Sequence, residues 1–136
     1  MIRVDKKGGY YMKQDLHIID NFIDEREFRN YVGSILKERG FIDIVIDDVT
    51  LNDENQLNDN DIKATLDGVP YTIQTFLNKE ITKLEIDEVV ADMNQEIIGQ
   101  GILVTNTVIK EEIKEYASNY RIELWDRDLL TQYLLN

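Results

Sequence analysis

Apolar residues recur at helical spacing after Asp24, which predicts an amphipathic helix over residues 24–39. The apolar face consists of Phe28, Tyr31, Val32, Ile35 and Leu36. Asp24 is a suitable N-cap, and Glu27, three residues later, completes a capping box. Gly40 follows the helix, as is typical where a helix ends in a left-handed residue. The sequence therefore defines both ends of this helix.

Shorter segments after this helix predict strands. Residues 41–46 alternate imperfectly and are rich in β-branched side chains, so we expect a strand there. Residues 47–60 are polar and predict a long loop. A hairpin follows, with strands near 61–66 and 71–76 joined by Asp67-Gly-Val-Pro70.

The hairpin has one polar face. A four-residue connection predicts that Lys63 lies opposite Gln74, and the same register places Asp61 opposite Phe76. Because side chains alternate along a strand, polar residues gather on one side of the hairpin. These residues are Asp61, Lys63, Thr65, Thr72 and Gln74. We interpret this face as a candidate site.

Helices and buried strands alternate in the second half of the chain. Helical spacing predicts a helix over 82–98 that ends before Gly99 and Gly101, and 101–105 is a continuous apolar run typical of a buried strand. A further helix carries Ile109, Ile113, Tyr116 and Ala117, a last strand covers 121–125, and Asp126 caps a closing helix. The order α-β-β-β-α-β-α-β-α predicts an α/β fold with a mixed sheet flanked by helices.

The composition indicates one domain with a short extension. At 136 residues the chain is long enough for a single core, and we expect a domain over 24–136 after an extension over 1–23. In this extension, Lys6-Lys-Gly-Gly9 predicts the turn of a short β-hairpin. The N-terminus has no apolar stretch like that of a secretory signal, no run suits a membrane span, and cysteine is absent. We therefore expect a cytoplasmic protein.

The charge argues against a nucleic-acid ligand. Asp and Glu outnumber Lys and Arg by 27 to 15, which gives a net charge of -12. DNA binding depends mainly on basic side chains that displace counterions from phosphates, so an acidic chain repels DNA overall. The acidic stretch over 43–61 is interpreted as a solvated loop rather than a metal or partner site.

Three segments of the second half carry a specific resemblance to a known family. Gly101-Ile-Leu-Val-Thr-Asn106, Glu111-Glu-Ile-Lys-Glu-Tyr-Ala117 and Ile122-Glu-Leu-Trp-Asp126 resemble segments written G-I-x-V-T-N, E-E-A-x-x-x-A and I-x-L-x-D. Both the segments and the separations between them resemble those of the Mrr-type restriction endonucleases, a branch of the PD-(D/E)xK nuclease fold. The resemblance covers residues 24–135 and implies a restriction-endonuclease-like fold and a type IV restriction endonuclease.

The resemblance also implies a catalytic hairpin, which this chain departs from. By that resemblance Asp61 and Gln74 match the residues that bind a divalent metal. If the chain is active, the expected cofactor is Mg²⁺, and if it is inactive, no cofactor is expected. The family's lysine position is occupied by Phe76, a side chain that can neither donate to phosphate nor position water. Arg29 stands where the family commonly has Glu. Normal hydrolysis is therefore expected to fail.

Two other lysines are candidates to replace the missing one. Lys63 lies on the same predicted face as Asp61, and Lys79 matches a second lysine often seen in the family's Q-x-K-x-x-K stretch. For each, the simpler interpretation is an exposed lysine without a catalytic role. The candidate catalytic residues are thus Asp61, Gln74, Lys63 and Lys79.

Three further residues are interpreted as structural. His17 is the only histidine and has no imidazole or cysteine to share a metal with, so we expect a surface or packed residue. Thr105 and Asn106 follow a buried strand, where a crevice often opens, but as residues before a helix we expect them to be caps. Trp125 is expected to pack in the core or at an edge.

Three function hypotheses follow. The first is a catalytically degenerate Mrr-like domain that acts as a binding or regulatory module linked to DNA restriction. The second is an active or residual Mg²⁺-dependent DNA endonuclease that uses Asp61, Gln74 and either Lys63 or Lys79. The third is a structural protein that pairs through Met1–Ile19, as a homodimer or with a protein partner. DNA is a partner by family resemblance alone, and the net charge disfavours it.

Overall fold

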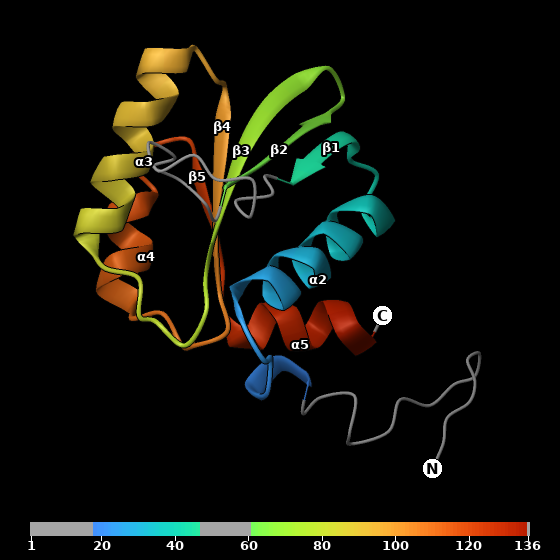
Figure 1. The fold of residues 1–136 in the computed structure, drawn as a ribbon. Coiled ribbons are helices and arrows are strands. Elements are labelled where there is room, and N and C mark those ends of the chain that lie inside the picture. The colour runs from blue at the N-terminus through green and yellow to red at the C-terminus, as the bar shows by residue number, and fades with distance from the viewer. Residues whose placement is uncertain (1–17, 47–60, 136) are drawn as a thin grey trace.

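The computed structural model describes residues 18–46 and 61–135, which form three layers around a central sheet (Figure 1). Two helices cover each face of the sheet: α2 (Glu25–Glu38) and α5 (Arg127–Leu135) on one side, α3 (Lys83–Glu96) and α4 (Glu111–Ala117) on the other. No helix in these described ranges has the length and apolar content needed to cross a membrane.

The described strands form one mixed sheet in the order β1-β2-β3-β4-β5. The strands are β1 (Ile42–Ile46), β2 (Asp61–Leu66), β3 (Val69–Phe76), β4 (Gln100–Thr105) and β5 (Ile122–Trp125). The pairs β1–β2 and β2–β3 are antiparallel, whereas β3–β4 and β4–β5 are parallel. Each parallel pair is connected by a helix, as a parallel crossover requires. The predicted α/β class and element order are confirmed.

Both ends of α2 lie where the sequence predicts them, but the capping box does not form, because the Glu27 carboxylate accepts a hydrogen bond from the Ile23 N–H instead of the Asp24 N–H. The Asp24 carboxylate accepts a hydrogen bond from the Glu27 N–H at 2.9 Å, which caps the first turn. At the other end Gly40 has φ of 97°, and the N–H of Phe41 donates to the Leu36 carbonyl at 3.0 Å. This is the bonding pattern of a helix closed by a left-handed glycine.

The predicted register of the β2–β3 hairpin is wrong by two residues. Asp67 and Gly68 both have positive φ, 53° and 81°, so they alone close a tight turn of the type favoured in hairpins. Val69 and Pro70 therefore belong to β3 rather than to the connection. Lys63 pairs with Thr72 instead of Gln74, and Asp61 pairs with Gln74 instead of Phe76. A shift of two residues keeps the same side chains on each face, so the predicted polar face remains.

Two hydrophobic cores lie on opposite faces of the sheet. The first packs α2 and α5 against the sheet and includes Phe28, Val32, Ile62, Ile73, Trp125 and Leu130. The second packs α3 and α4 against the other face and includes Phe76, Ile81, Ile86, Val89, Leu103 and Ile113. Trp125 is buried in the first core, in agreement with the packing role expected for it.

The first core also contains a residue that precedes α2. Ile19 is fully buried in it, and the neighbouring Asp20 forms a bidentate ion pair with Arg127, with distances of 2.9 and 2.8 Å. The packed unit thus includes residues on the N-terminal side of the boundary expected at residue 24. The turn predicted at Lys6–Gly9 and the residue His17 lie outside the described residues.

Candidate functional site

Asp61 is the first residue of β2, and both oxygens of its carboxylate are engaged. The residue is 7% exposed. Its Oδ1 accepts a hydrogen bond from the Thr72 hydroxyl at 3.1 Å, and its Oδ2 lies 3.2 Å from the Lys63 ammonium. Thr72 is on β3 and Lys63 is two residues along β2, so strand alternation and the hairpin pairing together bring these groups onto one face.

Lys63 connects Asp61 to a second carboxylate. Its Nζ lies 3.1 Å from Oε1 of Glu96, the last residue of α3, and 3.4 Å from the Thr72 hydroxyl oxygen. Burial lowers the pKa of Lys63, but the charges and hydrogen bonds of Asp61 and Glu96 outweigh this effect and hold the pKa above its ordinary value. The ammonium is therefore charged at any physiological pH.

Gln74 lies beside Asp61 on the neighbouring strand. The two residues are Cα partners in the β2–β3 ladder, and Gln74 is 7% exposed. On its other side Gln74 pairs with Leu103 of β4, which belongs to the core beneath α3 and α4. The structure therefore brings three of the four candidate residues together: Asp61, Lys63 and Gln74.

Phe76 lies at the end of β3 and belongs to the second core. Its side chain is 7% exposed and packs in the apolar cluster formed with α3 and α4. Its nearest strand partner is Thr105 at the end of β4. The position that the sequence resemblance assigns to the family's lysine is thus filled by a ring that helps to join the sheet to two helices.

Lys79, the other lysine candidate, is paired at the start of α3. Its Nζ lies 3.2 Å from Oε2 of Glu85 and 5.4 Å from the centroid of the Phe76 ring. The other oxygen of Glu85 accepts hydrogen bonds from the Thr82 N–H and hydroxyl, at 2.8 and 2.6 Å. Through its ion pair with Glu85, Lys79 therefore extends the N-terminal cap of α3.

The Glu85 contacts predict a pH-dependent contribution to stability. Burial raises the pKa of Glu85, but hydrogen bonds from Thr82 and Lys79 outweigh burial and lower the pKa below its ordinary value. A lowered folded-state pKa gives stability that is present above the unfolded pKa, about 4.3, and lost as the pH falls through the folded value. Glu85→Gln should cost about 1 kcal/mol at pH 7.

Urea denaturation at several pH values measures this contribution. The difference in unfolding free energy between the wild type and Glu85→Gln should shrink as the pH falls below about 4. Glu88→Gln, in the same helix, is the control because the Glu88 side chain is exposed to solvent. A Glu85→Gln difference that stayed constant down to pH 2 would contradict the ionised capping contact.

Arg29 of α2 is buried. By the sequence resemblance, this position commonly carries Glu in the Mrr-type nucleases. The residue is 3% exposed, and its Nε has no hydrogen-bond partner within the part of the chain that the structure describes. A guanidinium is always charged and cannot act as a metal ligand. This position therefore adds no acidic group to the site.

Thr105 and Asn106 do not cap a helix, contrary to the sequence prediction. Helix α4 begins at Glu111 with Lys110 as N-cap. The Thr105 hydroxyl instead donates to the Lys79 carbonyl at 2.7 Å. The Asn106 side chain accepts from the Asn78 N–H at 2.6 Å and donates to the Ile19 carbonyl at 2.9 Å. The expected cap is wrong because several residues separate this strand end from α4, which leaves the polar groups to bond other segments.

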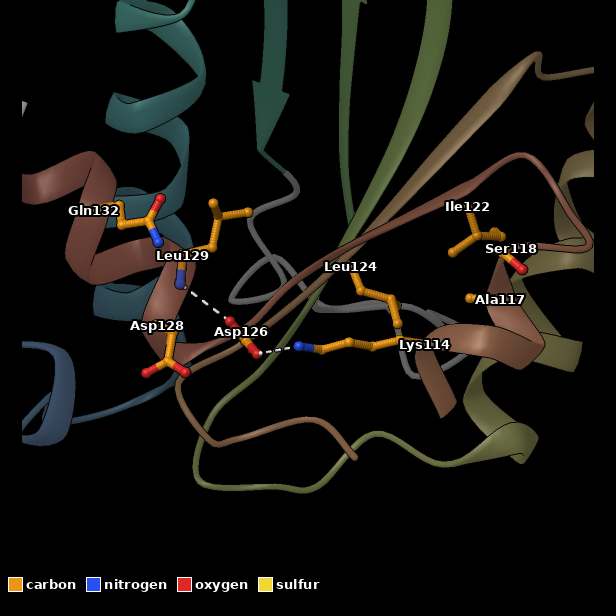
Figure 2. Close-up of a pocket in the computed structure, with 9 residues that line it drawn as sticks. All are labelled: Lys114, Ala117, Ser118, Ile122, Leu124, Asp126, Asp128, Leu129 and Gln132. Atoms are coloured by element: carbon orange, nitrogen blue, oxygen red, sulfur yellow. Dashed lines mark hydrogen bonds and ion pairs between the residues drawn. The ribbon is translucent and has the colours of Figure 1, made fainter. Parts of the chain in front are cut away.

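A surface hollow of about 530 Å³ lies at the β5 edge of the sheet and is lined by residues of α4, β5 and α5 (Figure 2), and Asp61 is not part of this lining. Its lining includes Lys114 of α4 and Asp126, whose Oδ1 accepts from the Leu129 N–H at 3.1 Å and so caps α5 as predicted. Lys114 Nζ points at the other oxygen, Oδ2, from 3.4 Å, which is an ion pair without hydrogen-bond geometry. The Lys114–Asp126 ion pair thus joins α4 to the start of α5.

The donors around Asp61 do not fit a Mg²⁺ ion. Mg²⁺ takes oxygen ligands at about 2.0–2.1 Å in octahedral geometry and is bound through free carboxylates. At Asp61 one oxygen accepts from Thr72 and the other faces the Lys63 ammonium, and Gln74 adds only a neutral amide oxygen. Among the described residues, no group of three or more His, Cys, Asp or Glu side chains is placed to hold a metal.

Comparisons with known proteins point to one family. The model of the family Mrr_cat, described as restriction endonuclease, matches residues 20–134. A solved structure described as "Crystal Structure of Protein of Unknown Function AF1548" superposes with a TM-score of 0.58 at 21% sequence identity, and the match covers 76% of this chain and 58% of that one. At this identity the likeness concerns the fold. No curated protein matches the chain.

Proposed function

The chain belongs to the Mrr_cat restriction endonuclease family, and from that premise we propose that it keeps the nuclease fold without hydrolysing phosphodiester bonds. It acts instead as a binding or regulatory module linked to DNA restriction. Nucleases of this family are typically metal dependent, and Mg²⁺ is not a cofactor of this proposed module.

The buried ring of Phe76 is the observation that carries the proposal. Phosphodiester hydrolysis concentrates negative charge on the phosphoryl group, and a cationic donor at the site stabilises that charge. Loss of one such electrostatic contact typically costs a factor of about 10²–10³ in rate. Phe76 supplies no charge and is packed in the second core, so the side chain cannot turn toward Asp61 without opening that core.

The net charge supports a protein rather than DNA as the partner. A chain with net charge -12 gains little from counterion release, which supplies most of the affinity for a DNA duplex. The proposed module therefore meets DNA only through a separate recognition protein. A cytoplasmic location, where restriction acts, belongs to the same proposal.

A plasmid cleavage assay tests the proposal. The full chain is incubated with supercoiled plasmid, unmethylated and methylated, in Mg²⁺ and separately in Mn²⁺. The expected result is no nicking or linearisation above that of Asp61→Ala, which lacks the candidate metal ligand. Cleavage by the wild type that Asp61→Ala abolishes would overturn the proposal.

A second candidate, a residual metal-dependent endonuclease, is favoured by one contact. Lys63 Nζ lies 3.2 Å from the Asp61 carboxylate, so an ammonium is present in the site although it comes from β2 rather than from position 76. If this candidate is correct, Lys63→Met abolishes cleavage as completely as Asp61→Ala. Lys79→Met, whose lysine is paired with Glu85, leaves that cleavage unchanged.

A further inference from the structure

The Lys63 ammonium occupies the space between two carboxylates on the polar face of the sheet. It lies 3.2 Å from Asp61 and 3.1 Å from Glu96, and the Thr72 hydroxyl is 3.4 Å away. These are all oxygen neighbours of the kind that a hard cation takes in proteins. The side-chain cation therefore has the surroundings that an inorganic cation would otherwise have.

The groups around Lys63 come from β2, β3 and α3, and the pairing and order of these elements bring them together. Asp61 and Lys63 are on β2, and Thr72 is their neighbour on β3. Glu96 ends α3, which returns from the end of β3 to the start of β4 and so leaves its last turn beside Thr72. The burial of the two carboxylates differs, because the Asp61 side chain is 9% exposed and that of Glu96 is 53% exposed.

This difference in burial determines which partner depends on Lys63. A buried carboxylate without a compensating charge is costly, whereas an exposed one is solvated by water. Asp61 is thus the group that the ammonium must neutralise, and Glu96 adds a second, adaptable contact from the surface. Thr72 donates to Asp61 but adds no charge.

We propose that Lys63 is the resident cation of this site, occupying the place beside Asp61 that the family resemblance assigns to a divalent metal. The inference rests on the proposed function and deepens it, because it names what replaces the metal. Consequently the native chain binds no Mg²⁺ or Mn²⁺ through Asp61. Removal of the ammonium takes away the positive charge that Asp61 and Glu96 share, with the Gln74 amide nearby, and a dication then binds between them.

Mn²⁺ titration of the full chain, followed by the electron paramagnetic resonance of free Mn²⁺, tests this inference. In the wild type the bound Mn²⁺ should be the same as in Asp61→Asn. Lys63→Met should gain a site for one Mn²⁺ per chain, with an affinity at least about tenfold above any site of the wild type. The double variant Lys63→Met/Asp61→Asn should lose that site again.

Lys79→Met is the matched control. It also removes an ammonium from a buried carboxylate, but the Glu85 carboxylate keeps its hydrogen bonds from Thr82, so no Mn²⁺ site should appear. Circular dichroism establishes that each variant is folded. If Lys63→Met is unfolded, Lys63→Gln replaces it, and the comparison of the wild type with Asp61→Asn still decides the question.

Two results would overturn the inference. One is Mn²⁺ binding by the wild type that Asp61→Asn removes, and the other is a folded Lys63 variant that gains no Mn²⁺. Neither depends on DNA cleavage. Asp61-dependent Mn²⁺ binding without cleavage would reject the resident cation but leave the proposed function standing, whereas Asp61-dependent cleavage by the wild type would reject the proposed function.

Discussion

Phe76→Ala is expected to lower the free energy of unfolding by about 3–4 kcal/mol. The ring is 7% exposed and packs with residues of α3 and α4, so truncation removes apolar contacts and leaves a cavity in the second core. Urea denaturation followed by circular dichroism measures the loss. The result bears on function because a side chain that holds two helices to the sheet is committed to packing.

Two further substitutions test whether the loss of unfolding free energy is specific to the Phe76 ring or follows any substitution of a phenylalanine. Phe76→Leu keeps most of the buried volume and should cost about 1 kcal/mol. Phe22→Ala removes the same ring from a partly buried position before α2 and should cost less than Phe76→Ala. A loss of under about 1 kcal/mol for Phe76→Ala would contradict the packing role, because such a small value is typical of exposed rings.

Asn106→Ala is expected to cost about 3 kcal/mol. Its side chain, in a residue that is 4% exposed, bonds the Asn78 N–H at 2.6 Å, the Asn78 side-chain oxygen at 3.0 Å and the Ile19 carbonyl at 2.9 Å. Alanine leaves the buried Ile19 carbonyl unsatisfied, which costs about 1–3 kcal/mol, and the loss of each bond to the exposed Asn78 adds about 0.5–1.5 kcal/mol. The connection after β3 and the segment before α2 should loosen together.

Amide hydrogen exchange and urea denaturation measure both parts of that prediction. Protection should fall at the Asn78 amide and at residues 19–22 more than in the β2–β3 ladder. Asn119→Ala is the control, because that side chain is exposed and makes one hydrogen bond, to the Tyr116 carbonyl at 3.3 Å. Equal losses for the two substitutions would contradict the special role of Asn106.

Local signals account for the parts of the fold that the sequence predicted well. Asp24 and Gly40 define the ends of α2 through contacts within a few residues, and Asp126 caps α5 in the same way. The polar face of the hairpin was also predictable, because strand alternation depends only on the spacing of neighbours. Asp61, Lys63 and Gln74 thus belong to a face that the sequence alone indicates.

The hairpin register was less predictable because two turns were compatible with the sequence. Pro70 suggested a longer connection, since proline lacks the N–H that a strand interior uses. In the structure Pro70 lies next to the pair Leu66–Val69 that closes the turn, so its missing N–H points away from β2 in the alternating ladder. The β3–β4 ladder begins only at Tyr71, so β4 does not need that N–H either.

Contacts between distant segments could not be predicted from local pattern. Glu96 reaches Lys63 across 33 residues, and its place depends on the path of α3 back to the start of β4. The bonds of Asn106 to Ile19 and Asn78 likewise depend on where three chain segments meet. Topology does give a signal for the place of Glu96. A helix that connects two parallel strands ends near the amino-terminal ends of those strands.

We propose that this member of the nuclease family does not hydrolyse DNA. The most direct test is a single-turnover incubation of supercoiled plasmid with an excess of the full chain in Mn²⁺, with Asp61→Ala and Lys63→Met alongside. All three proteins are expected to leave the plasmid equally intact. Plasmid cut by the wild type and left intact by Asp61→Ala would contradict the proposal.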